Sequence, residues 1–202
     1  MNKFFKLNKL ILQTLFLYIY LLISPTKSLE KYYNGDSLSS YFSGVISLQN
    51  NQYKESYNFL KNLENLEDSH SKYSKSYIET LVNSSKINEA FRYSKKLKVK
   101  EMNFFQSDLI IISKYIKNND FFKANNYISS VSKNNYTPLQ ELLSKVIFSW
   151  VKIENSKLNY EEANEVFKSI DPKYKNIKRI NNAFLNCYFD TLNVETEFLD
   201  LI

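Results

Sequence analysis

The sequence predicts an all-α protein, a right-handed α-solenoid of stacked helical hairpins with four repeats and a partial fifth. The main observation is a spacing. Small residues recur at intervals of 34, 34 and 39 residues, at Ser56, Ala90, Ala124 and Ala163. An apolar or aromatic residue lies three positions before each of them, and another apolar residue lies seven positions after it. A period of 34 residues is typical of a helix–turn–helix unit that buries its apolar face only against copies of itself. Glycine (2) and proline (3) are also scarce, which disfavours hairpin-rich sheets and glycine-rich phosphate loops.

Residues 1–28 have the pattern of a secretory signal peptide. Residues 1–9 are basic, residues 10–24 are apolar apart from Gln13 and Thr14, and Pro25 precedes the small residues of a cleavage site. An uncleaved anchor is the alternative, although a membrane span needs about 17–25 apolar residues. We therefore expect an exported, periplasmic protein, with a protein anchored in the membrane by residues 10–24 as the alternative. Residues 29–37 are expected to form a short linker.

The charge of the chain is concentrated in this first segment. The whole chain has 27 Lys and Arg against 21 Asp and Glu, a formal net charge of +6. Residues 1–28 contain four of the lysines and none of the acids, so the remaining chain is close to neutral. A neutral body gives no reason to expect nucleic acid as a partner. Membrane contact is expected only through the N-terminal segment, if that segment is not cleaved.

The first two repeat units are expected over residues 38–70 and 71–103, within a helical repeat domain that covers residues 38–202. In the first unit, residues 41–48 are apolar at helical spacing, and a second helix begins near Tyr53. The second unit repeats this arrangement around residues 73–82 and 87–97. Asn51 and Ser85 each lie five residues before the small residue of the following helix. Asparagine tolerates the left-handed backbone that ends a helix, so we expect the turns there.

The later units are expected over residues 104–137 and 138–173, followed by a partial fifth over 174–202. Asn119 takes the turn position in the third unit, and Asp120 can cap the helix that begins at Phe121. Thr137 and Gln140 form a predicted capping box at the start of the fourth unit. The fourth interval is five residues longer than the others, and we expect the extra residues in the loop at 132–138. The partial fifth unit ends without a polar capping helix, which suggests a fragment of a longer protein or a partner at this end.

This pattern resembles the tetratricopeptide repeat family, which combines a 34-residue period with a glycine in the first helix, an aromatic residue opening the second and an alanine one turn later. The resemblance covers about residues 38–170 and implies helical hairpins that bind proteins. Isoleucine or valine replaces the glycine in units two to four, and serine replaces the first alanine. The residues expected to pack the repeats are Gly44, Tyr53, Ser56, Leu60, Ala90, Phe121, Ala124, Trp150, Tyr160 and Ala163.

The residues that usually carry chemistry are nearly absent from the sequence. The chain has one histidine, His70, and one cysteine, Cys187, so neither a zinc site nor a Cys–His pair is expected. Adjacent carboxylates such as Glu67 and Asp68 point apart on a helix, so we interpret them as charges in a first helical turn rather than as an acid–base pair. We expect no cofactor, no metal and no enzymatic activity.

Two basic clusters are also interpreted as charges at the ends of helices. Residues 95–100 contain four lysines at the end of a predicted helix, where cations favour the helix dipole. Residues 173–179 contain three lysines and Arg179, which could instead touch an anionic membrane surface.

The resemblance also implies a concave groove lined by the first helix of each unit. Its outward residues mix aromatic and apolar anchors with lysine and asparagine, which suits an extended peptide or a helix of a partner protein. The carboxylate-clamp residues of the family are not reproduced. The expected groove residues are Tyr41, Gln49, Lys75, Glu79, Asn83, Leu109, Ser113, Lys117, Phe148, Lys152 and Asn155, with Val45 beside them.

We therefore expect a protein–protein interaction scaffold or assembly factor in a bacterial cell envelope or periplasm, with protein partners whose identity the sequence leaves open. One alternative is the N-terminal helical repeat region of a longer envelope enzyme, or of a secretion or polysaccharide-export component, truncated at residue 202. Another is a membrane-anchored solenoid that faces the cytoplasm.

Overall fold

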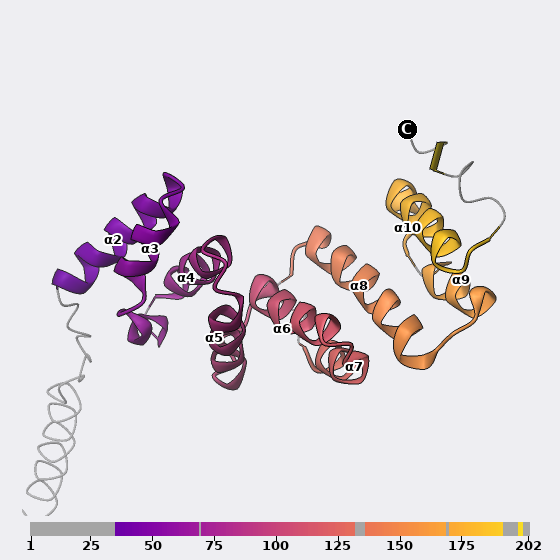
Figure 1. Ribbon diagram of the computed structural model, residues 1–202, viewed down its shortest axis with the longest axis horizontal. Helices are drawn as coiled ribbons and strands as arrows, with labels where there is room; N and C mark the ends of the chain where they lie inside the picture. The colour runs from indigo at the N-terminus through magenta and orange to yellow at the C-terminus, as the bar shows by residue number, and fades with distance from the viewer. Residues whose placement is uncertain (1–34, 69, 132–135, 169, 192–197, 200–202) are drawn as a thin grey trace, which may run out of the picture. The chain divides into compact units, whose positions relative to one another are not determined.

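The structure, a computed structural model, describes residues 35–68, 70–131, 136–168, 170–191 and 198–199. The expected signal segment and nearly all of the expected linker lie outside these residues. The regular structure of the described residues is entirely helical. In the same part of the chain, no helix is both long and apolar enough to cross a membrane. The elements, shown in Figure 1, are α2 (Gly35–Gln49), α3 (Tyr53–Leu60), η1 (Glu64–Asp68), α4 (Ser71–Asn83), α5 (Ile87–Val99), α6 (Phe105–Lys117), α7 (Phe121–Ser130), α8 (Pro138–Ser156), α9 (Tyr160–Lys168), η2 (Pro172–Tyr174) and α10 (Lys175–Tyr188).

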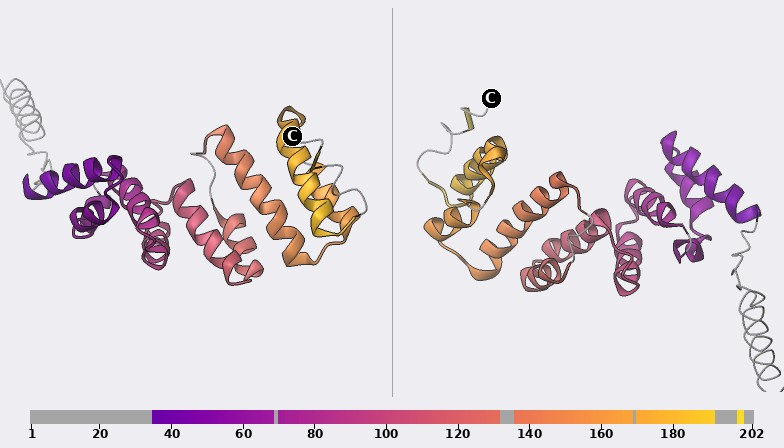
Figure 2. Two further views of the ribbon diagram at one scale, coloured as in Figure 1. Left: turned by 45° about the horizontal axis from the view of Figure 1, so that its top comes forward. Right: turned by 180° about the vertical axis from the view of Figure 1, so that it is seen from behind.

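Successive helices pack against one another along the chain. From α3 to α10 each α-helix contacts the next, and α4 also contacts α6, the first helix of the following hairpin. Figures 1 and 2 show the helices in hairpins joined by short turns. Of the expected fifth unit, the structure describes α10 and residues 198–199, and the remainder of 192–202 lies outside the described residues.

The turns inside the first three hairpins repeat with the period of the sequence. Asn51, Ser85 and Asn119 lie 34 residues apart and have φ angles of 60°, 58° and 56°. After each one, the next backbone N–H donates to a carbonyl five residues earlier, as from Gln52 to Ser47 at 2.8 Å. These are the bonds that close a helix at a left-handed residue. Asparagine and serine therefore do here what glycine often does.

The fourth hairpin departs from this register because α8 is longer. It has 19 residues, whereas α4 and α6 have 13 each. We expected the extra residues in the loop at 132–138, but they extend this helix. Thr137 and Gln140 form a reciprocal capping box and Pro138 occupies the first turn, so the helix begins there. Its turn residue is Lys157, with φ 50°, six residues before the buried alanine of α9.

The small residues lie where the helices converge. Ser56, Ala90, Ala124 and Ala163 are all wholly buried. The hydroxyl of Ser56 lies 2.7 Å from that of Thr80 on α4, and both are buried. A serine can therefore replace the usual alanine, because its hydroxyl has a partner on the neighbouring hairpin.

The glycine in the first helix marks a close helix–helix contact. A Cβ atom added at Gly44 would lie 2.6 Å from the side chain of Leu60 on α3. The corresponding positions of the later hairpins carry Ile78, Ile112 and Val151, and all three are buried. Only the first hairpin therefore requires glycine at this position.

The aromatic residues assigned to repeat packing occupy helix starts and a helix–helix contact. Tyr53, Phe121 and Tyr160 are the first residues of α3, α7 and α9. The indole Nε1 of Trp150 on α8 donates to Asn181 on α10 at 2.9 Å. This hydrogen bond ties the fourth hairpin to the first helix of the fifth unit.

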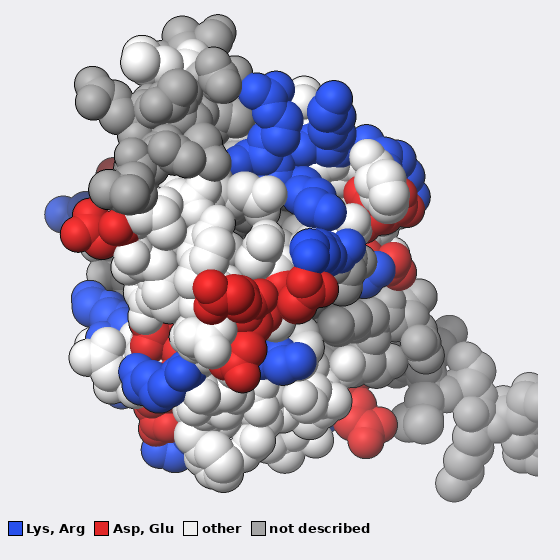
Figure 3. All heavy atoms as spheres, turned by 90° about the vertical axis from the view of Figure 1, so that its right-hand side faces the viewer, with Lys and Arg blue, Asp and Glu red and all other residues white. Residues whose placement is uncertain are grey.

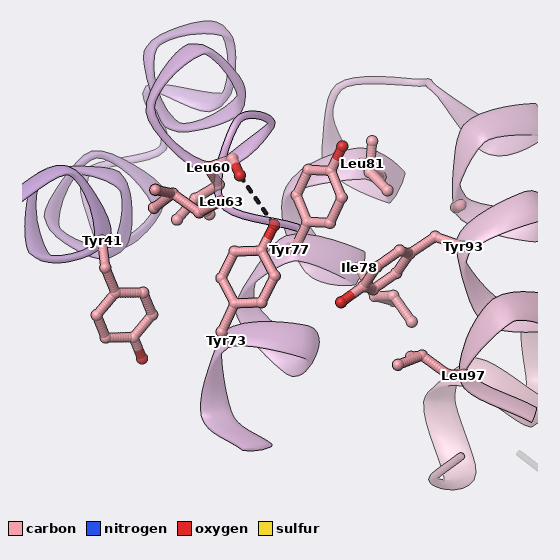
Figure 4. Packing of buried hydrophobic residues seen from close by; sticks show 10 residues of the cluster. Tyr41, Leu60, Leu63, Tyr73, Tyr77, Ile78, Leu81, Tyr93 and Leu97 are labelled. Carbon is pink, nitrogen blue, oxygen red and sulfur yellow. Dashed lines mark hydrogen bonds between the residues drawn. The ribbon is translucent and has the colours of Figure 1, made fainter. Parts of the chain in front are cut away.

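A cluster of buried hydrophobic residues forms the core of the first two hairpins (Figure 4). Tyr73 is wholly buried, and its hydroxyl donates to the carbonyl of Leu60 at 2.9 Å. Tyr41, which we expected to face outward into the groove, belongs to this core and is only 7% exposed. Its ring lies edge-on to the imidazole of His70, with 4.7 Å between the two ring centroids, because the segment that leads into α4 packs against this face of α2. That prediction was wrong.

Candidate protein-interaction surface

The predicted groove residues are distributed along the described helices, and most are exposed. Leu109 and Asn155 are half-buried, and Lys75 places its ammonium 5.8 Å from the ring centroid of Phe104. Phe148 and Lys152 share a cleft whose other lining residues were not predicted. The exposed members of the predicted groove are Gln49, Lys75, Glu79, Asn83, Ser113, Lys117 and Lys152.

This α8–α9 cleft has a volume of about 670 Å³. Its floor is apolar, formed by the half-buried side chains of Phe148, Leu158 and Val166. Its α8 wall is one helical face, because residues 145, 148, 149 and 152 follow the i, i+3, i+4, i+7 pattern. Its residues are Lys145, Phe148, Ser149 and Lys152 from α8, Leu158 from the turn, and Glu162, Glu165 and Val166 from α9.

The two walls of the cleft carry opposite charges. Glu162 accepts from the backbone N–H of Asn159 at 3.0 Å in a capping box, and Glu165 forms an ion pair with Lys168. Figure 3, which faces the right-hand side of Figure 1, shows basic side chains gathered at its upper right and acidic side chains at its centre, with both kinds interspersed towards its lower left. The acids of the α9 wall are therefore already engaged within the chain.

The lysines of the α8 wall are less engaged. Among the described residues, neither Lys145 nor Lys152 has a hydrogen bond or an ion pair within salt-bridge distance, and both are exposed. Lys145 lies close enough to Asp171 to help lower the pKa of that carboxyl, although hydrogen bonds from Lys173 are the main cause. Lys152 is thus the cation of the cleft that is most available to a partner.

A filled contact that uses the corresponding acid lies between α3 and α5. The hydroxyl of Tyr57 on α3 donates to Glu89 on α5 at 2.9 Å, and the ammonium of Lys86 lies 4.2 Å from the Tyr57 ring centroid. Burial is the main cause that raises the pKa of Tyr57, and the hydrogen bond to Glu89 is the second. We call this contact of Tyr57, Lys86 and Glu89 the first seam.

The repeat register shows which residues correspond to the first seam. Tyr57 follows the small residue of α3, and Glu89 precedes the small residue of α5. On α7 and α9 the same positions are Asn125 and Glu162, and Glu162 lines the α8–α9 cleft. The acid is thus retained while asparagine replaces the aromatic ring.

The sequence did not predict a buried ion-pair cluster between the first two hairpins. Glu67 in η1 is 1% exposed and accepts from Lys96 at 2.8 Å and Lys100 at 2.9 Å, while Asp68 also pairs with Lys100 at 2.9 Å. We had interpreted these acids and lysines as independent helix-end charges. The fold joins them because η1 packs against α4, which in turn contacts α5.

A second buried carboxylate, Asp108 on α6, accepts hydrogen bonds from neutral donors among the described residues. It accepts from Tyr127 at 2.6 Å, from Tyr136 at 2.7 Å and from the amide of Asn103 at 3.0 Å. Burial is the main cause that raises the pKa of both tyrosines, and the hydrogen bond to Asp108 is the second. This arrangement fastens Tyr136, just before α8, to α6 and α7. Within the described ranges, no group of three or more His, Cys, Asp or Glu could hold a metal ion.

Comparison with known proteins supports the fold rather than a specific activity. No protein-family model and no curated protein sequence matches the chain. A solved structure, the MamA RS-1 ArsTM double mutant, superposes with a TM-score of 0.60 at 14% sequence identity. The match covers 83% of this chain and 93% of that chain. At this identity the likeness bears on the fold alone. The chain therefore has a helical-repeat fold of the tetratricopeptide-like kind found in MamA.

Proposed function

We propose that this chain is a protein-interaction scaffold, an exported α-solenoid that holds a segment of a partner protein in the α8–α9 cleft. The observation that carries the proposal is an open, apolar-floored cleft on a tetratricopeptide-like fold. Such folds present surfaces between stacked helices to other proteins. In this proposal the hairpins form a right-handed array of four repeats and a partial fifth.

The use of the acidic residues favours binding over catalysis. Glu67, Asp108 and Glu89 are all engaged by side chains of neighbouring helices, which suits a structural role. The cleft combines an apolar floor with charged walls, as at a protein interface with a polar rim. We propose no enzymatic activity for this chain.

Export to the periplasm or cell envelope is part of the same proposal and rests on the composition of residues 1–28. Mass spectrometry of the protein purified from its native cells tests it. A mature chain that begins at residue 29 supports export. An intact Met1 contradicts cleavage and supports an anchor instead.

Site-specific photocrosslinking tests the scaffold. A photoreactive residue replaces Phe148 or Lys152 in the cleft, and a control replaces Lys54, an exposed residue of α3. We expect one discrete crosslinked protein from both cleft positions and none from position 54. The same products from all three positions, or none from any, would contradict the proposal.

A further inference from the structure

We infer that the segment bound in the α8–α9 cleft is acidic and inserts an aromatic side chain, with its carboxylates toward α8. This inference rests on the proposed function and specifies the partner of that site. It follows from three features of the described residues: the apolar floor of the cleft, the lysines of its α8 wall and the internal example of the first seam.

The first seam shows a contact that the corresponding acid makes elsewhere in this fold. The Tyr57 ring lies between two hairpins, 4.2 Å from the ammonium of Lys86, and its hydroxyl donates to Glu89. Glu162 is the corresponding acid of α9, and on α7 an asparagine takes the position of Tyr57. Phe148, Leu158 and Val166 form a floor suited to a ring supplied from outside.

The charge pattern selects the flanking residues of the partner. Lys145 and Lys152 are seven residues apart on one face of α8, about 10 Å along its axis. Two carboxylates of a partner with a similar separation can pair with both ammonium groups. The acids of α9 are already engaged with Asn159 and Lys168. Attraction at α8 therefore favours an acidic segment and fixes its orientation in the cleft.

Fluorescence anisotropy with synthetic peptides tests this inference on the mature chain. The probe is an acetylated and amidated 12-residue peptide with a central phenylalanine and a glutamate on each side, the two glutamates being three residues apart, about 10 Å in an extended chain. In one control peptide lysines replace the glutamates, and in another alanine replaces the phenylalanine. We expect the acidic phenylalanine peptide to bind at least about tenfold more tightly than either control, and more weakly as salt is added.

Charge reversal in the protein provides the decisive comparison. The Lys145→Glu/Lys152→Glu variant should prefer the lysine peptide over the glutamate peptide. The matched variant Lys54→Glu/Lys95→Glu reverses two exposed lysines outside the cleft and should retain the original preference. Circular dichroism should show the same helix content in both variants. Equal binding of the glutamate and lysine peptides to the wild-type chain would overturn the inference.

Two further outcomes separate this inference from the proposed function. Crosslinking to a partner together with equal binding of the peptides would retain the scaffold and refute the acidic partner. If no discrete partner is crosslinked and the glutamate and lysine peptides bind equally, both the scaffold and the acidic partner are refuted. Self-association in sedimentation velocity that is abolished by Lys152→Glu would identify a second copy of this chain as the occupant and overturn the inference.

Discussion

The first seam and the α8–α9 cleft each contain the acid that precedes the buried alanine of α5 or α9, yet this acid meets an aromatic ring in one region and lines an open cleft in the other. In the first seam, Tyr57 reaches from α3 to Glu89 on α5. In the fourth unit the acid recurs as Glu162, but Asn125 stands in the aromatic position and a cleft of about 670 Å³ lies beside the acid. The comparison teaches that corresponding acids can serve different purposes, since Glu89 joins two hairpins whereas Glu162 lies at an open surface.

The lysines of the two regions differ in the same way. Lys96 on α5 and Lys100, the residue that follows α5, are bound to Glu67, which is wholly buried, and so they hold the second hairpin to η1. Lys145 and Lys152 on α8 face the cleft without such a partner among the described residues. Lysines on a helix can therefore stabilise the fold where a buried acid lies beside them, or remain available to a ligand where none does.

The largest effect is expected from overfilling the small-residue column beside the first seam. Ala90 is wholly buried, so Ala90→Leu should lower the free energy of unfolding by about 3 kcal/mol, because the added side chain forces the helices apart. Urea denaturation measures this change. Asn88→Leu, at an exposed position of the same helix, is the control. Equal stability of the two variants would show that the column is not tightly packed.

The next effect concerns the buried carboxylate of η1. Glu67→Gln should cost about 2 kcal/mol of unfolding free energy, since it removes the charge that accepts from Lys96 and Lys100. Asp68→Asn affects an acid whose side chain is 52% exposed and should cost only a few tenths of a kcal/mol. Thermal melts of both variants at low ionic strength check the difference. A larger loss from Asp68→Asn would be inconsistent with a structural role for Glu67.

A smaller effect is expected from the hydroxyl of the first seam. Tyr57→Phe keeps the ring but removes the hydrogen bond to Glu89, which should cost about 1 kcal/mol at neutral pH. Tyr53→Phe, which loses a hydroxyl bonded only to Asn51 in the adjoining turn, is the control and should cost less. The free energy of unfolding in urea at pH 7 provides the measurement.

Tyr57 should also contribute to the decrease of the unfolding free energy at alkaline pH. The folded-state pKa of Tyr57 is raised above its ordinary value of 10. The contribution of the neutral hydroxyl is therefore complete below pH 10 and decreases as pH rises through the folded-state pKa, because the unfolded chain ionises first. Between pH 9 and 11, unfolding free energy should fall more steeply for the wild type than for Tyr57→Phe. Parallel curves would argue against a raised pKa.

The smallest effect on stability is expected from filling the open region. Asn125→Tyr restores the aromatic residue of the first seam, and its hydroxyl could donate to Glu162 as Tyr57 does to Glu89. We expect a gain of less than about 1 kcal/mol in unfolding free energy, seen as a small rise in Tm. Asn126→Tyr, at the next and exposed position, should leave Tm unchanged. A loss of stability in Asn125→Tyr alone would mean that the two regions do not correspond.

The local features of the fold could be predicted from the sequence because they recur with a period. Left-handed turns such as Asn51 and buried small residues such as Ala90 follow from the 34-residue spacing. Contacts between separate segments could not be predicted. The partners of Glu67 lie 29 and 33 residues away, and Tyr127 and Tyr136 reach Asp108 from different parts of the chain.

The errors in the predicted surface have physical causes. Tyr41 was placed outward from the pattern of the tetratricopeptide repeat family, but the first helix has its own neighbour in the segment that leads into α4. The extra residues of the fourth unit were placed in a loop, whereas the capping box at Thr137 begins a longer helix. Phe148 and Lys152 were predicted, but the α9 wall was missed because only first helices were considered.

The binding of the acidic phenylalanine peptide by Asn125→Tyr tests the central claim most directly. If a tyrosine at position 125 reaches Glu162 as Tyr57 reaches Glu89, its ring lies beside an acid of the cleft and should compete with the peptide's phenylalanine. The affinity measured by anisotropy should then fall at least about tenfold, while Asn126→Tyr binds as the wild type does. Unchanged affinity of Asn125→Tyr, in a variant that retains its helix content and Tm, would contradict the account.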